Sequence, residues 1–339
     1  MGRSISVWVR ASLAGLLASL NAGTAYAALG PQDVALVINE ADPHSISTGE
    51  LYAAARAIPE DAVIRVRFEP VKGRITPKTF ARIKAEVDRK TPRRIQAYAL
   101  AWTRPWRVGC MSVTSAFALG FDKRYCARGC KATAPNPYFN TLSDKPFRDF
   151  GVRPSILIAG RTQDDVRGLI ERGVAADRTR PRASAYLMST SDAARNTRAA
   201  EYESYRNQFT GHLDVKVVEA DKLEDRTDVL FYFTGLVRVE AIESNRFVPG
   251  AIADHLTSSG GRLVGAQQMS ALAWLEAGAT GSYGSVVEPC SFPQKFPHPA
   301  VVMAHYLNGD TLIEAYWKSV AWPGQGLFIG EPLAAPFRR

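Results

Sequence analysis

The chain has 339 residues, of which 46% are hydrophobic and 22% are charged, a composition typical of a globular protein. Its formal net charge is +9, but the basic residues are scattered among acids and form no stripe interleaved with aromatic side chains, which argues against nucleic-acid binding. No P-loop, Gly-x-Gly-x-x-Gly, His-Glu-x-x-His or Gly-x-Ser-x-Gly motif is present, which excludes the readily recognised nucleotide-binding, metalloprotease and esterase classes.

The first 27 residues have the pattern of a secretory signal. Arg3 and Arg10 precede an apolar run over residues 11–20, and Ala25-Tyr26-Ala27 supplies the small residues that a signal peptidase requires. The run is too short to span a bilayer, which takes about 20 apolar residues. We therefore expect cleavage before Ala28, which lowers the formal charge to +7. The mature chain should have no transmembrane segment and work in the periplasm or outside the cell.

Residues 28–339 alternate short apolar runs with amphipathic stretches, which predicts an α/β protein with a mostly parallel sheet sandwiched by helices. Their length favours a single domain, or two intimate lobes over residues 28–175 and 176–339.

The first third of the mature chain predicts three strands and two helices. The strands are expected at 33–39, 63–68 and 95–102. Ser47 and Glu50 have the spacing of a capping box, which predicts a helix over 48–57. Thr76-Pro77 opens a second helix, with Phe80, Ile83 and Val87 on its buried face.

Residues 104–154 break this periodicity and are rich in cysteine, proline, glycine and aromatic residues. A long irregular stretch in a compact domain is usually functional or held by cross-links.

Regular alternation resumes at residue 155. Thr162 and Asp165 are expected to cap a helix that ends near Gly173. The strands predicted in this part are 155–159, 185–188, 215–218, 229–234, 263–266 and 280–287. The further helices are predicted at 193–209, 250–256, 270–276 and 311–320.

Four cysteines in an exported chain predict disulfides, and Cys126 and Cys130 are spaced for a local link that would leave Cys110 to pair with Cys290. Free thiols and a zinc site are the alternatives. The histidines show no metal-type spacing to the cysteines, so neither a metal nor a cofactor is expected.

Several strings resemble an uncharacterised family of exported bacterial proteins. They are Leu51-Tyr-Ala-Ala-Ala-Arg-Ala-Ile-Pro59, Gly278-Ala-Thr-Gly-Ser-Tyr-Gly-Ser-Val-Val-Glu-Pro289, Gly309-Asp-Thr-Leu-Ile-Glu-Ala-Tyr-Trp317 and Gly330-Glu-Pro-Leu333. The resemblance covers most of the mature chain and implies one continuous domain, without assigning an activity.

The order of predicted elements more distantly resembles the gingipain-like cysteine peptidases, whose core is caspase-like. In that family a histidine follows one central strand and a nucleophilic cysteine follows the next. The resemblance places Thr234 at the histidine position and Gln267 or Gln268 at the cysteine position. Peptidase chemistry needs both side chains, so this alignment implies its loss.

Candidate site residues were sought at the carboxyl ends of strands, where α/β proteins collect their ligands. Asn39 follows the first strand as part of a polar rim. Trp102, Arg104 and Trp106 follow the third and offer a cation between two rings, suited to an anionic or carbohydrate group. The competing interpretations are a turn with a helix cap around Asn39 and ordinary aromatic packing around Arg104.

These observations favour a non-catalytic exported protein that binds a peptide, a glycan or an envelope component. The alternative is a hydrolase of unrecognised type that uses Cys110, Glu288 or Glu40. A purely structural envelope protein is the third possibility.

Overall fold

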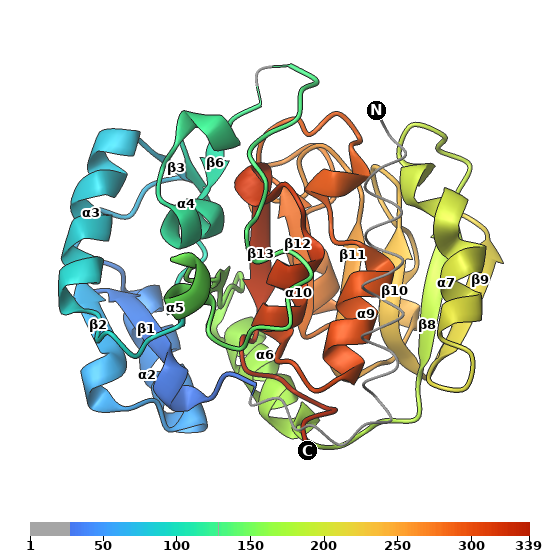
Figure 1. Ribbon diagram of the computed structural model, residues 1–339, viewed down its shortest axis with the longest axis horizontal. Helices are drawn as coiled ribbons and strands as arrows, with labels where there is room; N and C mark the ends of the chain where they lie inside the picture. Colours follow the sequence, from blue (N-terminus) through green and yellow to red (C-terminus); the bar gives the residue numbers. More distant parts are fainter. Residues whose placement is uncertain (1–27, 128) are drawn as a thin grey trace.

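The computed structural model describes residues 28–127 and 129–339 (Figure 1). The predicted signal, residues 1–27, lies outside the described residues. Within the described part of the chain, no helix has the length and apolar character needed to cross a bilayer.

Ten strands form one large sheet, whose order is β2-β1-β4-β7-β13-β12-β11-β10-β8-β9. The strands on its first side are β1 (Val34–Asn39), β2 (Val63–Val66), β4 (Ala97–Leu100) and β7 (Ser155–Leu157). Those on its second side are β8 (Ser184–Ser189), β9 (Asp214–Glu219), β10 (Val229–Thr234), β11 (Phe247–His255), β12 (Gly281–Ser285) and β13 (Gly326–Gly330). Pairing within β2-β1-β4-β7 is parallel, as is pairing from β12 to β9, whereas β12 and β13 are antiparallel.

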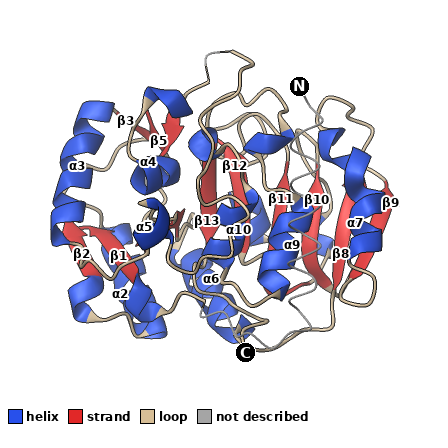
Figure 2. Ribbon diagram, in the orientation of Figure 1, coloured by secondary structure: helices blue, strands red, loops and turns tan. Residues whose placement is uncertain are grey.

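Helices cover both faces of this sheet (Figure 2). They are α2 (Pro43–Arg56), α3 (Pro77–Lys90), α4 (Val113–Leu119), α5 (Pro146–Phe150), α6 (Gln163–Ala176), α7 (Tyr202–Gln208), α8 (Leu272–Glu276), α9 (Pro299–Leu307) and α10 (Leu312–Ser319). Adjacent residues of β10 show the two layers, because Phe231 packs against Tyr306 of α9 and Tyr232 against Trp274 of α8. The predicted α/β class, with a mostly parallel sheet between helices, is confirmed.

A second, three-stranded sheet lies beside the first and consists of β3 (Arg74–Ile75), β5 (Arg107–Val108) and β6 (Met111–Ser112). Most of the irregular stretch 104–154 is built around it and around α4 and α5. In α4, Phe117 packs on Tyr98 and Trp102, so this region is attached to the hydrophobic core.

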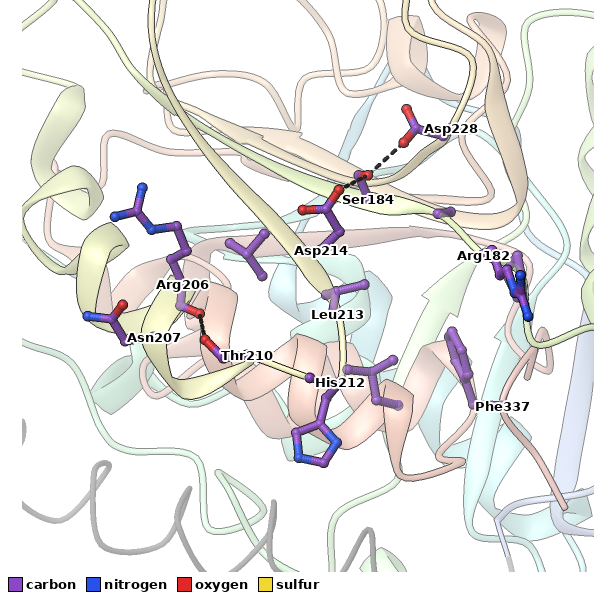
Figure 3. A pocket seen from close by; sticks show the side chains of 15 residues that line it. Arg182, Ser184, Arg206, Asn207, Thr210, His212, Leu213, Asp214, Asp228 and Phe337 are labelled. Carbon is purple, nitrogen blue, oxygen red and sulfur yellow. Dashed lines mark hydrogen bonds between the residues drawn. The ribbon is translucent and has the colours of Figure 1, made fainter.

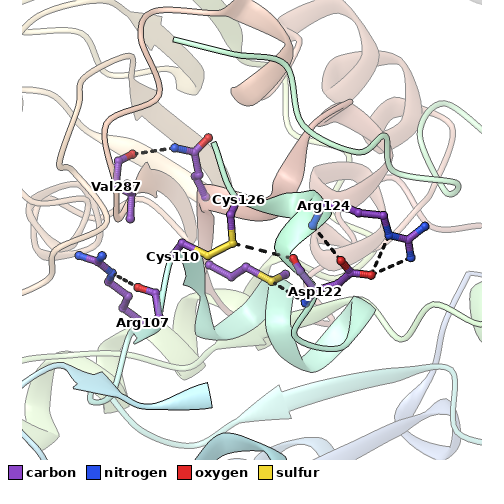
Figure 4. The surroundings of a disulfide bond; sticks show 9 residues. Arg107, Cys110, Asp122, Arg124, Cys126 and Val287 are labelled. Atoms are coloured by element: carbon purple, nitrogen blue, oxygen red, sulfur yellow. Dashed lines mark hydrogen bonds and ion pairs between the residues drawn. A yellow bond between two sulfur atoms is a disulfide. The ribbon is translucent and has the colours of Figure 1, made fainter. Parts of the chain in front are cut away.

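All four cysteines are in disulfides, as expected, but the pairing differs from the prediction. Cys110 is bonded to Cys126 (Figure 4), and Cys130 is bonded to Cys290. The spacing of Cys126 and Cys130 suggested a local link, yet the fold brings Cys290 beside Cys130 and Cys110 beside Cys126. The two bonds attach the irregular stretch to itself and to the loop after β12.

Several predicted elements are confirmed, most clearly the helices that carry complete capping signals. Thr76 caps α3, and Thr162 and Asp165 form the capping box of α6. The predicted inward face of α3, formed by Phe80, Ile83 and Val87, is buried.

Two predicted elements are wrong. Residues 250–255 of the helix predicted at 250–256 belong to β11, and residues 263–266 form no strand. The short Ala-Ile-Ala run of β11 was ambiguous by periodicity, and its place between β10 and β12 decides it. In addition, α2 begins at Pro43 with Asp42 as its cap, so Ser47 and Glu50 lie within the helix.

Candidate functional site

An open cleft of about 550 Å³ lies at the carboxyl ends of the first-side strands. Because β1, β4 and β7 are parallel neighbours, the residues that follow them meet at one edge of the sheet. The cleft is lined there by Asp42 and His44 after β1, by Thr103 and Arg104 after β4, and by Gly160 and Arg161 after β7. Lys72 from the loop after β2 and Val264 from the loop after β11 complete the wall.

The floor of the cleft is held by hydrogen bonds between strand ends. Thr103 Oγ1 donates to the carbonyl of Gly160 at 2.7 Å and accepts from the Gly160 amide at 3.2 Å. Thr103 is buried, so this pair fixes the ends of β4 and β7 relative to each other.

His44 faces this floor as a neutral side chain. Its Nδ1 accepts from Gln163 Nε2 at 2.9 Å, which places the proton on Nε2. Burial lowers the pKa of His44, opposed by Asp42 and reinforced by Arg104. Nε2 is buried and has no hydrogen-bond partner among the described residues, so it can donate to a bound acceptor.

A second hollow of about 430 Å³ shares Lys72 with the first and is lined by Arg74, Trp106, Arg107 and Arg262. We call the two hollows together the basic cleft. Its cationic side chains are Lys72, Arg74, Arg104, Arg107, Arg161 and Arg262.

Most of these cations lack an acidic partner. Arg161 pairs with Glu276. The side chains of Lys72, Arg74 and Arg104 make no ion pair or hydrogen bond with any residue in the described ranges. Arg107 and Arg262 donate to backbone carbonyls only. The basic cleft therefore has a large local excess of positive charge.

Two of the arginines lie directly opposite each other. Arg74 of β3 pairs in register with Arg107 of β5, and like charges in this position repel. The pKa of Arg107 is lowered, first by burial and then by Arg262 and Arg74. An anion between these side chains would remove the repulsion.

Trp106 forms part of the cleft wall by packing over Gly73. A Cβ on Gly73 would lie 2.2 Å from the Trp106 ring, so only glycine allows this contact. The Trp106 amide also donates to the Gly73 carbonyl at 3.0 Å. The ring is largely covered and serves mainly as a wall.

The sequence-predicted binding residues are only partly brought together. Arg104 and Trp106 line the two hollows of the basic cleft. Trp102 is completely buried against Phe68 and Phe117, so the predicted arrangement of one cation between two rings is wrong. Asn39 is also buried, and its Oδ1 accepts from the amides of Ala41 and Phe68. It thus holds the turn after β1.

The three predicted catalytic candidates do not form a site. Cys110 is in a disulfide, so its thiolate is not available as a nucleophile. Glu288 is exposed and accepts from the Cys290 amide at 2.7 Å, whereas Glu40 lies at the end of β1. No hydrogen bond or ion pair joins Glu40 to Glu288.

On the second side of the sheet, the charged groups at the strand ends are buried and paired. Arg198 approaches Asp254 of β11 at 2.8 Å and donates to the Thr234 carbonyl at 2.6 Å. His255, the last residue of β11, accepts at Nδ1 from Trp274 Nε1, and its Nε2 faces the Met269 carbonyl. Burial lowers the pKa of His255 to about 4, so it is a neutral structural group.

The correction to β11 also changes the comparison with cysteine peptidases. The strand beside β10 ends at His255, so the position after it is Leu256, not Gln267 or Gln268. Gln268 instead accepts from Thr257 and Ser259 and organises the loop after β11. Thr234 is buried at the end of β10.

A small hollow of about 160 Å³ lies beside Arg198 and includes His298. His298 Nδ1 accepts from the Val301 amide, and its Nε2 meets the Tyr205 hydroxyl, which donates to Glu201. Burial lowers the pKa of His298 to about 4. Both ring nitrogens are thus committed to holding the start of α9.

A larger hollow of about 840 Å³ lies at the amino ends of β8 and β9 (Figure 3). Its carboxylates are engaged, because Ser184 donates to both Asp214 and Asp228, and Lys216 lies near both. It is also at the edge of the sheet where α/β proteins rarely place a ligand. The basic cleft is therefore the candidate functional site.

Sequence reasoning missed Lys72, Arg74, Arg107 and Arg262. These residues lie up to 190 positions apart in the chain, and only the small sheet and the loop after β11 unite them. Within residues 28–127 and 129–339, no group of three or more metal-binding side chains gathers into a metal site.

Comparison with known proteins gives limited information. No protein-family model matches the chain, and a search of curated proteins finds no match. Among solved structures, the chain is similar to one described as "Structure of Protease", with 10% identity, a TM-score of 0.43, and coverage of 91% of this chain and 79% of the other. It is also similar to the complex of the Porphyromonas gingivalis RgpB pro- and mature domains, with 8% identity, a TM-score of 0.44, and coverage of 89% and 79%. Likenesses at this level carry no argument about activity.

Proposed function

We propose that this protein is an exported, non-catalytic binding protein whose basic cleft holds the anionic groups of an envelope glycan. The observation that carries the proposal is the set of cations around the cleft, five of which have no acidic partner among the described residues. Guanidinium groups bind carboxylates and phosphates through paired hydrogen bonds, which a neutral ligand cannot replace.

Export is part of this proposal and is supported by two observations. The amino-terminal segment has the composition of a secretory signal, and the chain has two disulfides, which persist in oxidising compartments. We also treat residues 28–339 as one domain, because a single hydrophobic cluster extends from Leu29 to Ala334.

A glycan is favoured over a peptide because the site is an open hollow lined by several cations without acidic partners. The aromatic wall at Trp106 is largely covered, and the edges of the cleft are polar. Peptide grooves generally supply several pockets for apolar side chains, whereas the apolar side chains that line the first hollow are Pro70, Val71 and Val264.

The test is to measure binding of uronic-acid oligosaccharides and of neutral oligosaccharides of equal length to the exported protein. We expect the acidic ligand to bind at least about tenfold more tightly at low salt, with a preference that shrinks as salt rises. The triple variant Arg74→Gln, Arg104→Gln, Arg262→Gln should lose this preference. A matched triple variant at exposed positions outside the cleft, Arg82→Gln, Arg167→Gln, Arg226→Gln, should keep it. Equal binding of neutral and acidic ligands, or unchanged binding by the cleft variant, would refute the proposal.

A further inference from the structure

Glu314 is a buried carboxylate with an incomplete set of partners. It lies in the first turn of α10, where its Oε2 accepts from the Thr311 amide at 3.0 Å and from the Thr311 hydroxyl at 2.6 Å. The Leu29 amide donates to the same oxygen at 3.1 Å. Glu314 Oε1 is buried and has no hydrogen-bond partner in the described part of the chain.

The charges around Glu314 do not balance. Asp310 is the other buried carboxylate, and its Oδ2 pairs with Lys318 at 2.7 Å and with His305 Nδ1 at 2.8 Å. Burial lowers the pKa of His305, so Lys318 supplies the one full positive charge for two acids. Burial and the Asp310 charge raise the pKa of Glu314 to about 7. A buried carboxylate without a counterion is costly, and a cation beside Oε1 would relieve this.

The chain at Ala28 and Leu29 is fixed against this carboxylate. Both residues are buried, and Arg338 donates to the Ala28 carbonyl at 2.5 Å. The backbone nitrogen of Ala28 is one residue before the amide that binds Glu314 Oε2. Ala28 is also the residue that follows the Ala25-Tyr26-Ala27 cleavage pattern. The cleavage pattern therefore places the new amino terminus one residue before the Leu29 amide that binds Glu314.

We propose that Glu314 is the receptor site for the α-ammonium group of Ala28, which forms an ion pair with Oε1 after the signal is removed. Hydrolysis of the Ala27–Ala28 peptide bond by a signal peptidase consumes one water, leaves a carboxylate on Ala27 and an amine on Ala28, and the amine then takes up a proton. The new cation supplies the missing positive charge, so maturation completes the buried network around α10. This inference rests on the proposed export and cleavage, and it is independent of the ligand of the basic cleft.

The test compares the exported protein with a variant that has one glycine inserted between Ala27 and Ala28. Cleavage after Ala27 then gives a chain whose ammonium group is displaced by one residue. Intact mass identifies the first residue of each protein. The rate at which an acylating reagent modifies the α-amine at neutral pH measures how far the amine is protected. We expect the native amine to react at least about tenfold more slowly than the displaced one, since one unit of pKa changes the fraction of free amine tenfold.

Glu314→Gln should remove the protection in the same way, and Glu288→Gln, at an exposed carboxyl, should leave it unchanged. If Glu314→Gln does not fold, the glycine insertion alone decides the matter. Equal acylation of native and displaced amines would overturn the inference. A mature chain that begins at another residue would also overturn it and would leave the proposal for the basic cleft untouched, because glycan binding is measured separately.

Discussion

The charged residues at the strand ends differ between the two sides of the large sheet. After β1, β4 and β7 they open into the basic cleft, where Lys72, Arg74 and Arg104 have no acidic partner. After β10 and β11 they are closed, because Arg198 is neutralised by Asp254 and both nitrogens of His255 are engaged. The two sides therefore differ in the exposure of their charges: the basic cleft holds cations without acidic partners at an open hollow, whereas Arg198 is buried beside Asp254.

The largest loss of stability should come from breaking the buried ion pair at the ends of β10 and β11. Asp254→Asn leaves the buried Arg198 guanidinium without its counterion, and loss of one partner of a buried pair typically costs about 3–5 kcal/mol. Urea unfolding should show this loss. Glu224→Gln, which breaks the exposed pair with Lys222, should leave the free energy of unfolding nearly unchanged, because solvent screens exposed ion pairs. A small effect of Asp254→Asn would mean that the pair is hydrated, and the contrast between the two sides would fail.

The second-largest effect should come from acid, which destabilises the protein through buried neutral histidines on the side of β10 and β11. The pKa values of His255 and His298 are about 4 in the folded protein, below their value of about 6.5 in an unfolded chain. Between these values the unfolded state binds more protons at the two histidines, so the stability that they contribute is complete above pH 6.5 and is lost as the pH drops toward 4. Each histidine contributes roughly 3 kcal/mol to this loss.

The measurement is the free energy of unfolding from pH 7 to pH 4. His298→Gln should flatten the dependence, whereas His212→Gln, at an exposed histidine, should leave it unchanged. An unaltered slope in His298→Gln would contradict the assignment of His298 as a neutral buried group.

A smaller effect is expected at the wall of the basic cleft. Gly73→Ala places a methyl group against the Trp106 ring, and overpacking of this kind typically costs about 1–3 kcal/mol. It should also weaken anionic-ligand binding, since the hollow changes shape. Gly168→Ala in α6, where the added Cβ meets only the end of Arg172, should stabilise the protein by up to about 1 kcal/mol. Thermal unfolding and ligand titration of both variants separate the two roles.

The smallest expected effect on stability is that of Arg74→Gln, and it distinguishes most directly between a binding role and a structural role for Arg74. Arg74→Gln removes one of two like charges that face each other, so it should stabilise the protein by up to about 1 kcal/mol at low salt, and high salt should abolish the gain. The same change should weaken binding of the acidic ligand. Arg82→Gln is the control, at an exposed arginine of α3. A variant that loses stability as well as binding would show that Arg74 is structural.

The sequence predicts the local parts of this fold well. Capping signals at Thr76 and at Thr162 with Asp165 locate α3 and α6, because the side chains that form the caps lie within a few residues of each other. The run over 247–255 was misassigned in part as a helix, since its small apolar residues fit either element, and only pairing with β10 and β12 makes it a strand.

The site was harder to predict because it also depends on contacts between segments that are far apart in the sequence. Arg104 was found because it directly follows a strand, and the neighbouring Trp102 was wrongly included because sequence alone does not show which of two tryptophans enters the core. Arg74 and Arg107 come together through two-residue strands that leave no periodic signal. Contacts between distant short segments are not encoded in any local pattern.

The pairing of the cysteines has a consequence for biogenesis. Cys110 is bonded to the next cysteine in the chain, Cys126, and Cys130 to the next, Cys290. In a protein that crosses a membrane amino end first, the first two thiols emerge close together and can be oxidised at once. The third thiol can be oxidised only after its partner, 160 residues further along the chain, has also crossed. Under the proposed export, an oxidant that joins thiols in order of arrival would form both of these bonds without reshuffling.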